Sequence, residues 1–277
     1  MKHYMQQVIK PRSFSSHKGD YGRILVVGGS PEYVGSPTLV ALAAYATGAD
    51  IVKIAAPEKV AWAINACSPH LITLKLAGEF FNSSHIEQIL AEAAKADVVV
   101  VGNGLSDRKE TIEAVGILLQ KLEKMKANVI VDADAFKAKV IPKKSILTPH
   151  EREYLTLFSK IPPVKDFEKR KEAVRKMAEK FKTTILLKGG VDIITDGKKI
   201  EENRTHNPEM TVGGTGDTLA GIVATFWAQS SGLKPFESCA AGAWVNGVAG
   251  DLCLRKRKRV LPHWLVESIP EAMNHVL

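Results

Sequence analysis

Short apolar runs alternate with stretches of helical periodicity along the first half of the chain. Ile24–Val27, Ile51–Ala55 and Val98–Val101 are rich in β-branched residues, as expected for strands buried on both faces. After Ser84 the apolar residues recur three and four positions apart, so we expect a helix there with Ser84 as its N-cap. This alternation predicts an α/β fold with a central, mostly parallel sheet flanked by helices on both faces. Further strands are predicted at Leu71–Leu76, Val129–Val131 and Ile146–Leu147, and further helices over Thr38–Thr47, up to Ala66 and around Ile112–Leu122.

The last third of the chain has a different pattern. Thr184–Leu187, Val191–Thr195 and Lys199–Asn203 are predicted strands, and the turn Asp196-Gly197 favours an antiparallel hairpin. No break in composition and no internal repeat divides the chain, so we expect one domain over residues 1–277, with residues 1–18 as an N-terminal extension. Three long helices are predicted to complete it, over Thr215–Ser230, Pro235–Leu254 and Pro262–Leu277.

Composition and charge exclude several classes of protein. With 277 residues, 45% of them hydrophobic and 25% charged, the chain has an ordinary globular composition, which excludes a largely disordered protein. The net charge of +8 suggests nucleic acid at first, but Arg255–Arg259 carries +5 of it and leaves 8 − 5 = +3 for the rest. Aromatic residues make up only 6%, so no nucleic-acid partner is expected. The basic run is interpreted as a solvated helix end, although binding to a polyanion or to a neighbouring subunit stays open.

The cysteines and the N-terminus bear on where the protein works. Three scattered cysteines without a CxxC pair argue against disulfides and zinc and favour a reducing compartment. The first residues lack the apolar core of a secretory signal, and no uncharged stretch is long enough to span a membrane. The sequence therefore predicts a soluble, cytoplasmic protein with no membrane partner.

Glycine-rich or polar loops follow several of the predicted strands. In open α/β sheets ligands bind at the carboxyl ends of the strands, and glycine there lets backbone N–H groups approach an anion. Five such loops together favour a ligand that carries phosphate. No GxxxxGK[ST] motif occurs, and the loop that starts at Gly102 lacks the third glycine of a dinucleotide fingerprint. The loops are Gly28-Gly29-Ser30, Gly102-Asn103-Gly104, Asp132-Ala133-Asp134, Thr148-Pro149-His150-Glu151 and Lys188-Gly189-Gly190.

The motif with the most specific chemistry is VGGTGDTLAG, residues 212–221. Its glycines precede a long apolar helix, so the N–H groups of Gly214, Thr215 and Gly216 can form an anion hole at the positive end of the helix dipole. A carboxylate repels an anion, so Asp217 needs a reason to be there. A general base that deprotonates an attacking hydroxyl supplies one. The alternative is that Asp217 only caps the helix.

These motifs resemble those of a known group. The segment GGTGDTLAG is similar to the anion-hole motif of the ribokinase-like superfamily. From about Gly19 onward, GRILVVGGSPEYVGSP, GADIVKIAAPE, VGNGL, DADAF, LTPHEREY, LLKGG and NPEMTVGGTGDTLAG follow the order found in the NAD(P)H-hydrate dehydratases. The resemblance implies that ATP or ADP phosphorylates the ring hydroxyl of hydrated NADH or NADPH, and that loss of phosphate restores the dinucleotide. It also implies Mg²⁺ carried by the nucleotide, with no metal ligands from the protein.

The resemblance implies that four residues contact the hydrated dinucleotide. Ser36 stands where the family usually has Ala, and Gly104 and His150 match two further contacts. Asp217 matches a substrate contact and the base. Asn103 replaces the Pro that usually precedes Gly104. His150 has an alternative interpretation, because a histidine after Thr-Pro can cap the helix that follows.

The nucleotide is assigned to a second set of residues in the same way. The family's nucleotide loop is matched from Lys188 to Asp192, where the family usually has Thr in place of Asp192. Gly190 is expected to lie where a side chain would crowd whatever sits against the backbone. The nucleotide contacts that the resemblance implies are Lys188, Gly189, Gly190, Val191, Asp192 and Gly216.

Two other functions stay open. A kinase for an alcohol such as hydroxyethylthiazole or hydroxymethylpyrimidine would use the same anion hole and base, whereas a nucleotide sensor would bind without catalysis. Asp217 argues against the sensor, because pure phosphate binding is better without a carboxylate nearby. Asp132 and Asp134 are interpreted either as a pair for metal or acid–base chemistry or as residues that shape a loop. The resemblance leaves both ADP and ATP open as donor, with ADP favoured. It further implies a homo-oligomer such as a tetramer, and epimerase activity supplied by a separate chain.

Overall fold

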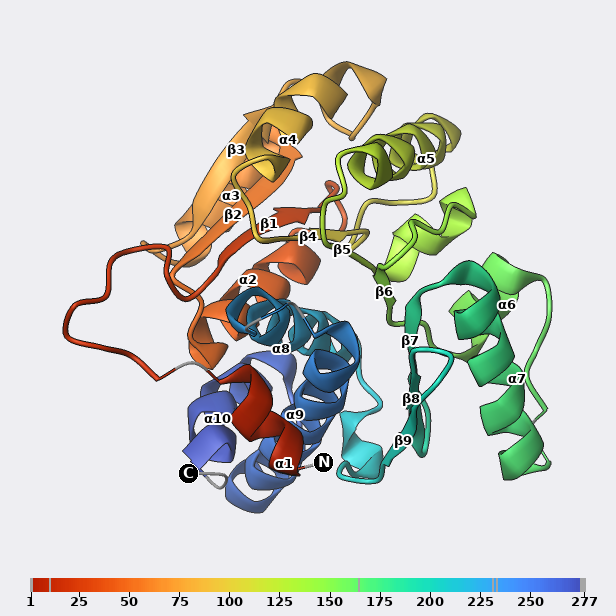
Figure 1. Ribbon diagram of the computed structural model, residues 1–277. Helices are drawn as coiled ribbons and strands as arrows, with labels where there is room; N and C mark the ends of the chain where they lie inside the picture. The colour runs from red at the N-terminus through yellow and green to blue at the C-terminus, as the bar shows by residue number, and fades with distance from the viewer. Residues whose placement is uncertain (1, 10, 164, 231, 233, 275–277) are drawn as a thin grey trace.

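One mixed sheet organises the molecule, which is described by a computed structural model over residues 2–9, 11–163, 165–230, 232 and 234–274 (Figure 1). Its strands are β1 (Arg23–Val27), β2 (Ile51–Pro57), β3 (Ile72–Leu76), β4 (Val98–Val101), β5 (Val129–Val131), β6 (Ile146–Leu147), β7 (Thr184–Leu187), β8 (Asp192–Thr195) and β9 (Ile200–Asn203). They lie in the order β3-β2-β1-β4-β5-β6-β7-β8-β9. The pairs from β3 to β7 are parallel, and β8 and β9 continue the sheet as antiparallel strands. The predicted parallel sheet and its antiparallel end are both confirmed.

Helices cover both faces of the sheet, as predicted (Figure 1). β1 shows why its sequence is apolar throughout: Ile24 and Val26 pack under one helical layer, and Leu25 and Val27 pack under the other. The first layer holds α1 (Lys2–Val8), α2 (Gly35–Thr47), α3 (Glu58–Cys67), α8 (Thr215–Gln229), α9 (Pro235–Arg257) and α10 (Pro262–Asn274). The second holds α4 (Ile86–Ala93), α5 (Lys109–Lys124), α6 (Glu151–Phe158) and α7 (Phe167–Phe181).

The N-cap predicted at Ser84 is wrong. Asn82 starts a short 3₁₀ turn, Ser83–His85, that leads into α4. The Asn82 side chain accepts a hydrogen bond from the Ser84 N–H at 3.0 Å. Asn and Ser are about equally good N-caps, so the sequence pattern did not distinguish between them.

The two ends of the chain pack on the first helical layer. Tyr4, Met5 and Val8 of α1 are buried in the core beside α9, and the Tyr4 ring meets Phe236 edge-on at 5.8 Å between centroids. Helix α1, within the segment 1–18 that was expected to be an extension, therefore contributes to the core. The last predicted helix begins at Pro262 as expected and is described to Asn274; residues 275–277 lie outside the described residues.

The basic run lies at the end of α9, so the predicted helix end is confirmed. The helix ends at Arg257, and Lys258 follows in the left-handed conformation, with φ at 60°. Carboxylates neutralise several of its cations. These ion pairs join Lys256 to Glu271, Arg257 to Glu267 and Arg259 to Glu209.

The cysteines and helices bear on the predicted compartment. Cys67 is exposed, Cys239 and Cys253 are buried, and all three are free thiols. Across the described part of the chain, no helix has both the length and the apolar character needed to cross a membrane.

Candidate active site

The candidate site lies past the carboxyl ends of β5, β6 and β7, among the parallel strands of the sheet. A cavity of about 780 Å³ lies there. It is lined by the start of α2, by the loops after β5, β6 and β7, by the loop after β9, and by the first turns of α8 together with part of α9. Three of the five loops that the sequence singled out therefore meet at one cavity.

The first turn of α8, where the sequence predicts an anion hole, lines the cavity. Gly214 is the N-cap, with φ at 101°, and a Cβ there would lie 2.7 Å from the side chains of Leu39 and Pro262. Only glycine fits both this conformation and this packing. The N–H groups at the start of a helix have no acceptor within it, so those of Thr215 and Gly216 are available to an anion in the cavity.

Asp217 does not cap α8, so the capping interpretation is wrong. Its two oxygens instead accept hydrogen bonds from other parts of the chain. Ser36 Oγ, at the start of α2, donates to Oδ2 at 2.7 Å, and Asn103 Nδ2, in the loop after β4, donates to Oδ1 at 2.7 Å. Asp217 thus faces the cavity as a fixed carboxylate next to the anion hole.

The surroundings of Asp217 suit a group that exchanges protons near neutral pH. Burial raises its pKa to about 6, and the negative charge of Asp132 acts in the same direction. The hydrogen bonds from Asn103 and Ser36 and the charge of Lys188 oppose the shift. A carboxyl with a pKa near the working pH is a competent general base.

A chain of buried polar groups continues from Asp217 across the floor of the cavity. Asn103 Nδ2 also donates to Asp132 Oδ2 at 3.0 Å, and Lys188 Nζ lies 3.1 Å from Asp132 Oδ1 and 3.6 Å from Glu153 Oε2. The side chain of Asp132 is 2% exposed and that of Lys188 is 19% exposed. Burial alone would lower the pKa of Lys188, but the charges of Asp132 and Glu153 outweigh it and the pKa is raised. Lys188 is therefore a cation beside the anion hole.

Asp132 and Asp134 do not form the pair considered above. Asp134 accepts from the Ser106 N–H at 3.1 Å and from Lys137 Nζ at 2.6 Å, so it shapes its own loop. Asp132 alone belongs to the site. Among the described residues, no cluster of three or more His, Cys, Asp or Glu side chains could hold a metal ion.

His150 caps α6 and also lines the cavity. Its Nδ1 accepts from the Glu153 N–H at 3.2 Å, and the Glu153 carboxylate accepts from the His150 N–H at 2.7 Å, which is a capping box. The capping interpretation is thus confirmed, and the ring lines the cavity as well. The sequence interpretation missed Glu153, whose pKa is raised by burial. The His-x-x-Glu spacing of the capping box is the sequence signal that could have identified Glu153.

The nucleotide loop predicted by resemblance is the open end of the cavity. Gly189 and Gly190 are exposed, and a Cβ on Gly190 would have no protein atom within 4 Å, so only a ligand could be crowded there. Asp192 is buried and fixes the loop: its Oδ1 accepts from the Gly189 N–H at 3.0 Å, and its Oδ2 accepts from Asn203 Nδ2 at 2.9 Å. His206, which the sequence interpretation missed, lies with Nε2 2.9 Å from the Gly190 carbonyl oxygen.

Two predicted contacts do not line the cavity. Val191 lies between Gly190 and β8 and is half-buried, and Gly104 lies behind Ser36. Gly104 has φ at 73°, and a Cβ there would lie 2.7 Å from Tyr33 Cβ and 3.0 Å from Ser36 Cβ. Gly104 therefore allows the loop after β4 to approach the start of α2 closely.

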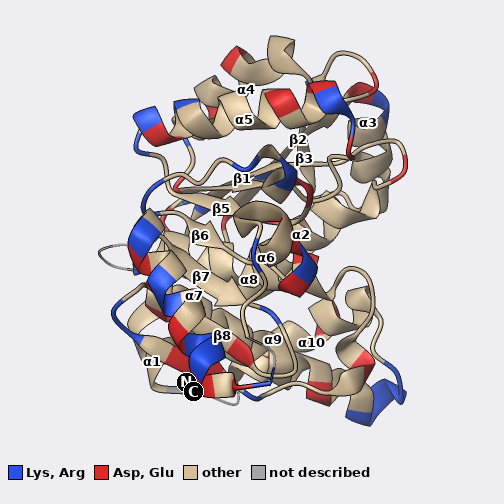
Figure 2. Ribbon diagram, turned by 90° about the vertical axis from the view of Figure 1, so that its right-hand side faces the viewer, with Lys and Arg blue, Asp and Glu red and all other residues tan. Residues whose placement is uncertain are grey.

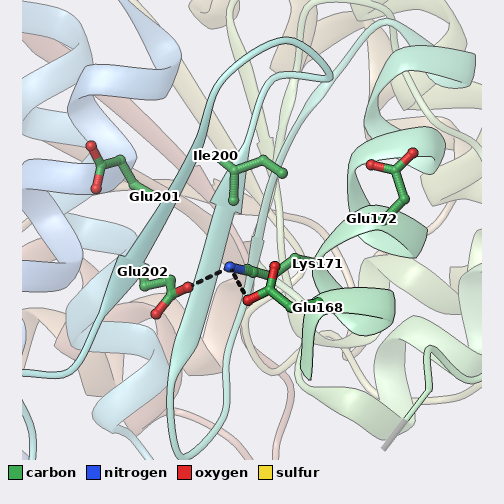
Figure 3. A pocket seen from close by; sticks show the side chains of 6 residues that line it. All are labelled: Glu168, Lys171, Glu172, Ile200, Glu201 and Glu202. Atoms are coloured by element: carbon green, nitrogen blue, oxygen red, sulfur yellow. Dashed lines mark hydrogen bonds and ion pairs between the residues drawn. The ribbon is translucent and has the colours of Figure 1, made fainter. Parts of the chain in front are cut away.

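A second hollow, of about 350 Å³, lies between α7 and the edge strand β9 (Figure 3). Lys171 pairs there with Glu168 and Glu202. Figure 2 shows acidic and basic residues in alternation along α7, as on an ordinary solvated helix. This hollow has no counterpart to the buried carboxylates or the helix N-terminus of the larger cavity.

A cavity at the strand ends, a helix N-terminus open to it and a buried carboxylate beside that N-terminus are the features that the sequence interpretation expected of an enzyme with the ribokinase-like fold. The comparison with protein families narrows this class. A model described as NAD(P)H-hydrate dehydratase matches residues 24–271, and the chain belongs to that family.

Similar proteins of known name agree with this assignment. The ADP-dependent (S)-NAD(P)H-hydrate dehydratase of Cenarchaeum symbiosum is 35% identical over 89% of this chain and 86% of its own length. The bifunctional NAD(P)H-hydrate repair enzyme Nnr of Hyperthermus butylicus is 41% identical over 96% of this chain, which spans about half (51%) of that relative. The ADP/ATP-dependent NAD(P)H-hydrate dehydratase of Bacillus subtilis, crystallised with ATP and Mg²⁺, has the same fold, with a TM-score of 0.83, 24% identity, and coverage of 100% of this chain and 98% of the other.

Proposed function

We propose that this protein restores NADH and NADPH from their hydrated forms, with ADP as the phosphoryl donor. The observation that carries the proposal is the buried carboxylate of Asp217 beside the first turn of α8, with a pKa of about 6. Family membership and the ADP-dependent relative support the substrate and the donor.

The reaction begins with proton transfer to Asp217. As the carboxylate takes the proton of the ring hydroxyl, that oxygen attacks the β-phosphorus of ADP, and the bond from this phosphorus to the bridging oxygen breaks, so AMP leaves with the electron pair. The N–H groups of Thr215 and Gly216 stabilise the charge on the transferring phosphoryl group. Lys188 Nζ would lie 3.3 Å from a Cβ on Gly216, so its positive charge is at the same place.

Elimination completes the repair. The ring C–O bond breaks with inorganic phosphate as the leaving group, and loss of a neighbouring ring proton restores the double bond. Hydrated NADH and ADP thus give NADH, AMP and phosphate. Phosphate leaves far more readily than hydroxide, which explains why a nucleotide is consumed.

The remaining site residues take the roles that the family resemblance assigned. Ser36, His150 and Asp217 line the cavity where the hydrated ring would bind, and Lys188, Gly189, Gly190, Asp192 and Gly216 line it where the nucleotide would bind. Gly104 and Val191 lie outside the lining, so their assigned contacts with the substrate and the nucleotide would be indirect. Because the described residues offer no three-ligand cluster, Mg²⁺ belongs to the proposal as part of the nucleotide substrate. A cytoplasmic location, which the free thiols support, a homotetramer, and a separate chain with epimerase activity stay proposals.

The test is recovery of NADH absorbance when the protein is incubated with hydrated NADH, Mg²⁺ and ADP. Recovery with ADP and none without a nucleotide supports the proposal. ATP in place of ADP tests the donor. Phosphorylation of hydroxyethylthiazole or hydroxymethylpyrimidine with no recovery of NADH would favour the kinase instead.

A further inference from the structure

Two side-chain donors from separate loops hold the two oxygens of Asp217. Ser36 Oγ donates to Oδ2 and Asn103 Nδ2 donates to Oδ1, each at 2.7 Å. Each carboxylate oxygen can accept more than one hydrogen bond, so an acceptor site remains on Asp217 for a substrate hydroxyl. The close approach at Gly104 brings the two donor loops together, since a Cβ on Gly104 would lie 3.0 Å from Ser36 Cβ.

The side-chain amide of Asn103 lies between two carboxylates. The residue is fully buried, and its NH₂ group donates to both Asp132 and Asp217. The opposite orientation would turn the amide oxygen toward two carboxylates, so the charges determine which end faces them. Its Oδ1 is left buried without a hydrogen-bond partner among the described residues. Such an unpaired acceptor is costly, so stability alone does not account for this arrangement.

The same two positions depart from the family pattern noted in the sequence. The resemblance described above has Ala at the position of Ser36 and Pro at the position of Asn103. Neither Ala nor Pro has a side-chain donor. The two departures meet on one carboxylate.

We propose that Ser36 and Asn103 are positioning residues that hold Asp217 ionised and aligned for proton transfer from the substrate hydroxyl. The role of Ser36 and Asn103 in turnover rests on the proposed function, whereas their effect on the ionisation of Asp217 does not depend on it. Burial and the nearby charge of Asp132 favour the protonated form of Asp217, and these two donors act against them together with Lys188. The helix N-terminus also favours the charged form.

Ser36→Ala tests the proposal, because it removes one hydroxyl and leaves Asn103 in place. The acid limb of the profile of kcat against pH is expected to move up by about one pH unit, since a hydrogen bond to a charged group contributes roughly that much. Because Ser36 also lines the cavity, the position of the limb is the readout and the size of the rate is not. Ser238→Ala is the control: that hydroxyl donates to the Lys234 carbonyl oxygen in α9, and its loss should leave the limb unmoved. An acid limb that stays at its wild-type pH in Ser36→Ala would overturn the proposal.

A titration that does not depend on turnover separates this proposal from the function itself. The Asp217 carboxyl signal can be identified by NMR as the one missing from Asp217→Asn, and followed against pH in wild type, Ser36→Ala and Asn103→Ala. The Asp217 pKa should rise in both single variants, whether or not the protein acts on hydrated NADH. An unchanged pKa in Ser36→Ala, in a protein with the wild-type melting temperature, would overturn the positioning role even if NADH recovery is observed.

Discussion

The two ends of the cavity are built in opposite ways. At one end Asp217 is fixed by Ser36 and Asn103, and the chain of buried polar contacts continues through Asp132 to Lys188. At the other end Gly189 and Gly190 are exposed. Under the proposed function, the end assigned to proton transfer is organised before the ligand binds, as catalysis requires. The end assigned to the nucleotide has exposed backbone that a ligand would cover.

The largest effect on the rate is expected from substitution of Asp217, at the end of the cavity where side chains hold the carboxylate in place. Asp217→Asn keeps the size of the side chain but removes the base, so the rate of NADH recovery should fall by roughly 10²–10⁴. Nucleotide affinity should hold or rise, because a negative charge next to the phosphates is lost. Steady-state kinetics, calorimetry and the melting temperature check this together. Near-normal turnover in a folded variant would rule out Asp217 as the base.

Lys188→Met would break the buried chain of charges. It leaves the carboxylates of Asp132 and Glu153 without their cation, which costs about 3–5 kcal/mol for a buried pair, and Tm should fall by several degrees. Thermal melts check this. The matched control is Lys171→Met in the hollow of Figure 3. Lys171 is about as buried as Lys188, but its partners Glu168 and Glu202 are 79% and 28% exposed, against 2% and 18% for Asp132 and Glu153, so the loss should be smaller. Equal decreases in Tm for the two variants would contradict the claim that the buried ion pairs of Lys188 contribute more to stability than the solvated ones of Lys171.

The raised pKa of Asp217 predicts how the rate and the stability of the protein depend on pH. Below about pH 6 the protonated carboxyl cannot accept a proton, so kcat should fall about tenfold per pH unit, with a plateau above. Stability should change in the opposite direction: between about pH 4 and 6 the folded protein binds a proton that the unfolded chain does not, so this group destabilises the fold as pH rises through that window. Tm against pH in wild type and Asp217→Asn measures the contribution. A rate that stays flat down to pH 4 would contradict the assignment.

A smaller effect is expected at the open end. A Cβ at position 190 would have no protein atom within 4 Å, and Gly190 does not have positive φ, so Gly190→Val should keep the melting temperature of the fold. Nucleotide affinity should fall about tenfold, or roughly 1.4 kcal/mol, because the side chain occupies space intended for the ligand. Calorimetric titration with ADP measures this. Unchanged affinity would remove the loop from the site.

Much of this architecture could be predicted from the sequence because its causes are local. Four consecutive valines at Val98–Val101 predict a strand buried on both faces, and the glycines before Asp217 predict a helix N-terminus open to an anion. The links between Asp217, Asn103 and Asp132 could not be predicted in this way. They join residues 29 and 114 positions apart in the chain. The pairing of β4 with β5 brings Asn103 to Asp132, and the packing of α8 against β4 brings Asn103 to Asp217. The ion pair between Glu153 and Lys188 could not be predicted for the same reason, because Glu153 is in α6 and Lys188 follows β7.

The central claim is that Asp217 starts a phosphoryl transfer whose product loses phosphate to give NADH. Its most direct test is the stoichiometry of one reaction mixture with hydrated NADH and ADP, in which NADH, AMP and inorganic phosphate are measured together. We predict equal amounts of all three from wild type, no such products from Asp217→Asn on the same time scale, and poor phosphorylation of hydroxyethylthiazole under the same conditions. AMP formed with no NADH, or efficient phosphorylation of the thiazole alcohol with none on the hydrate, would contradict the claim.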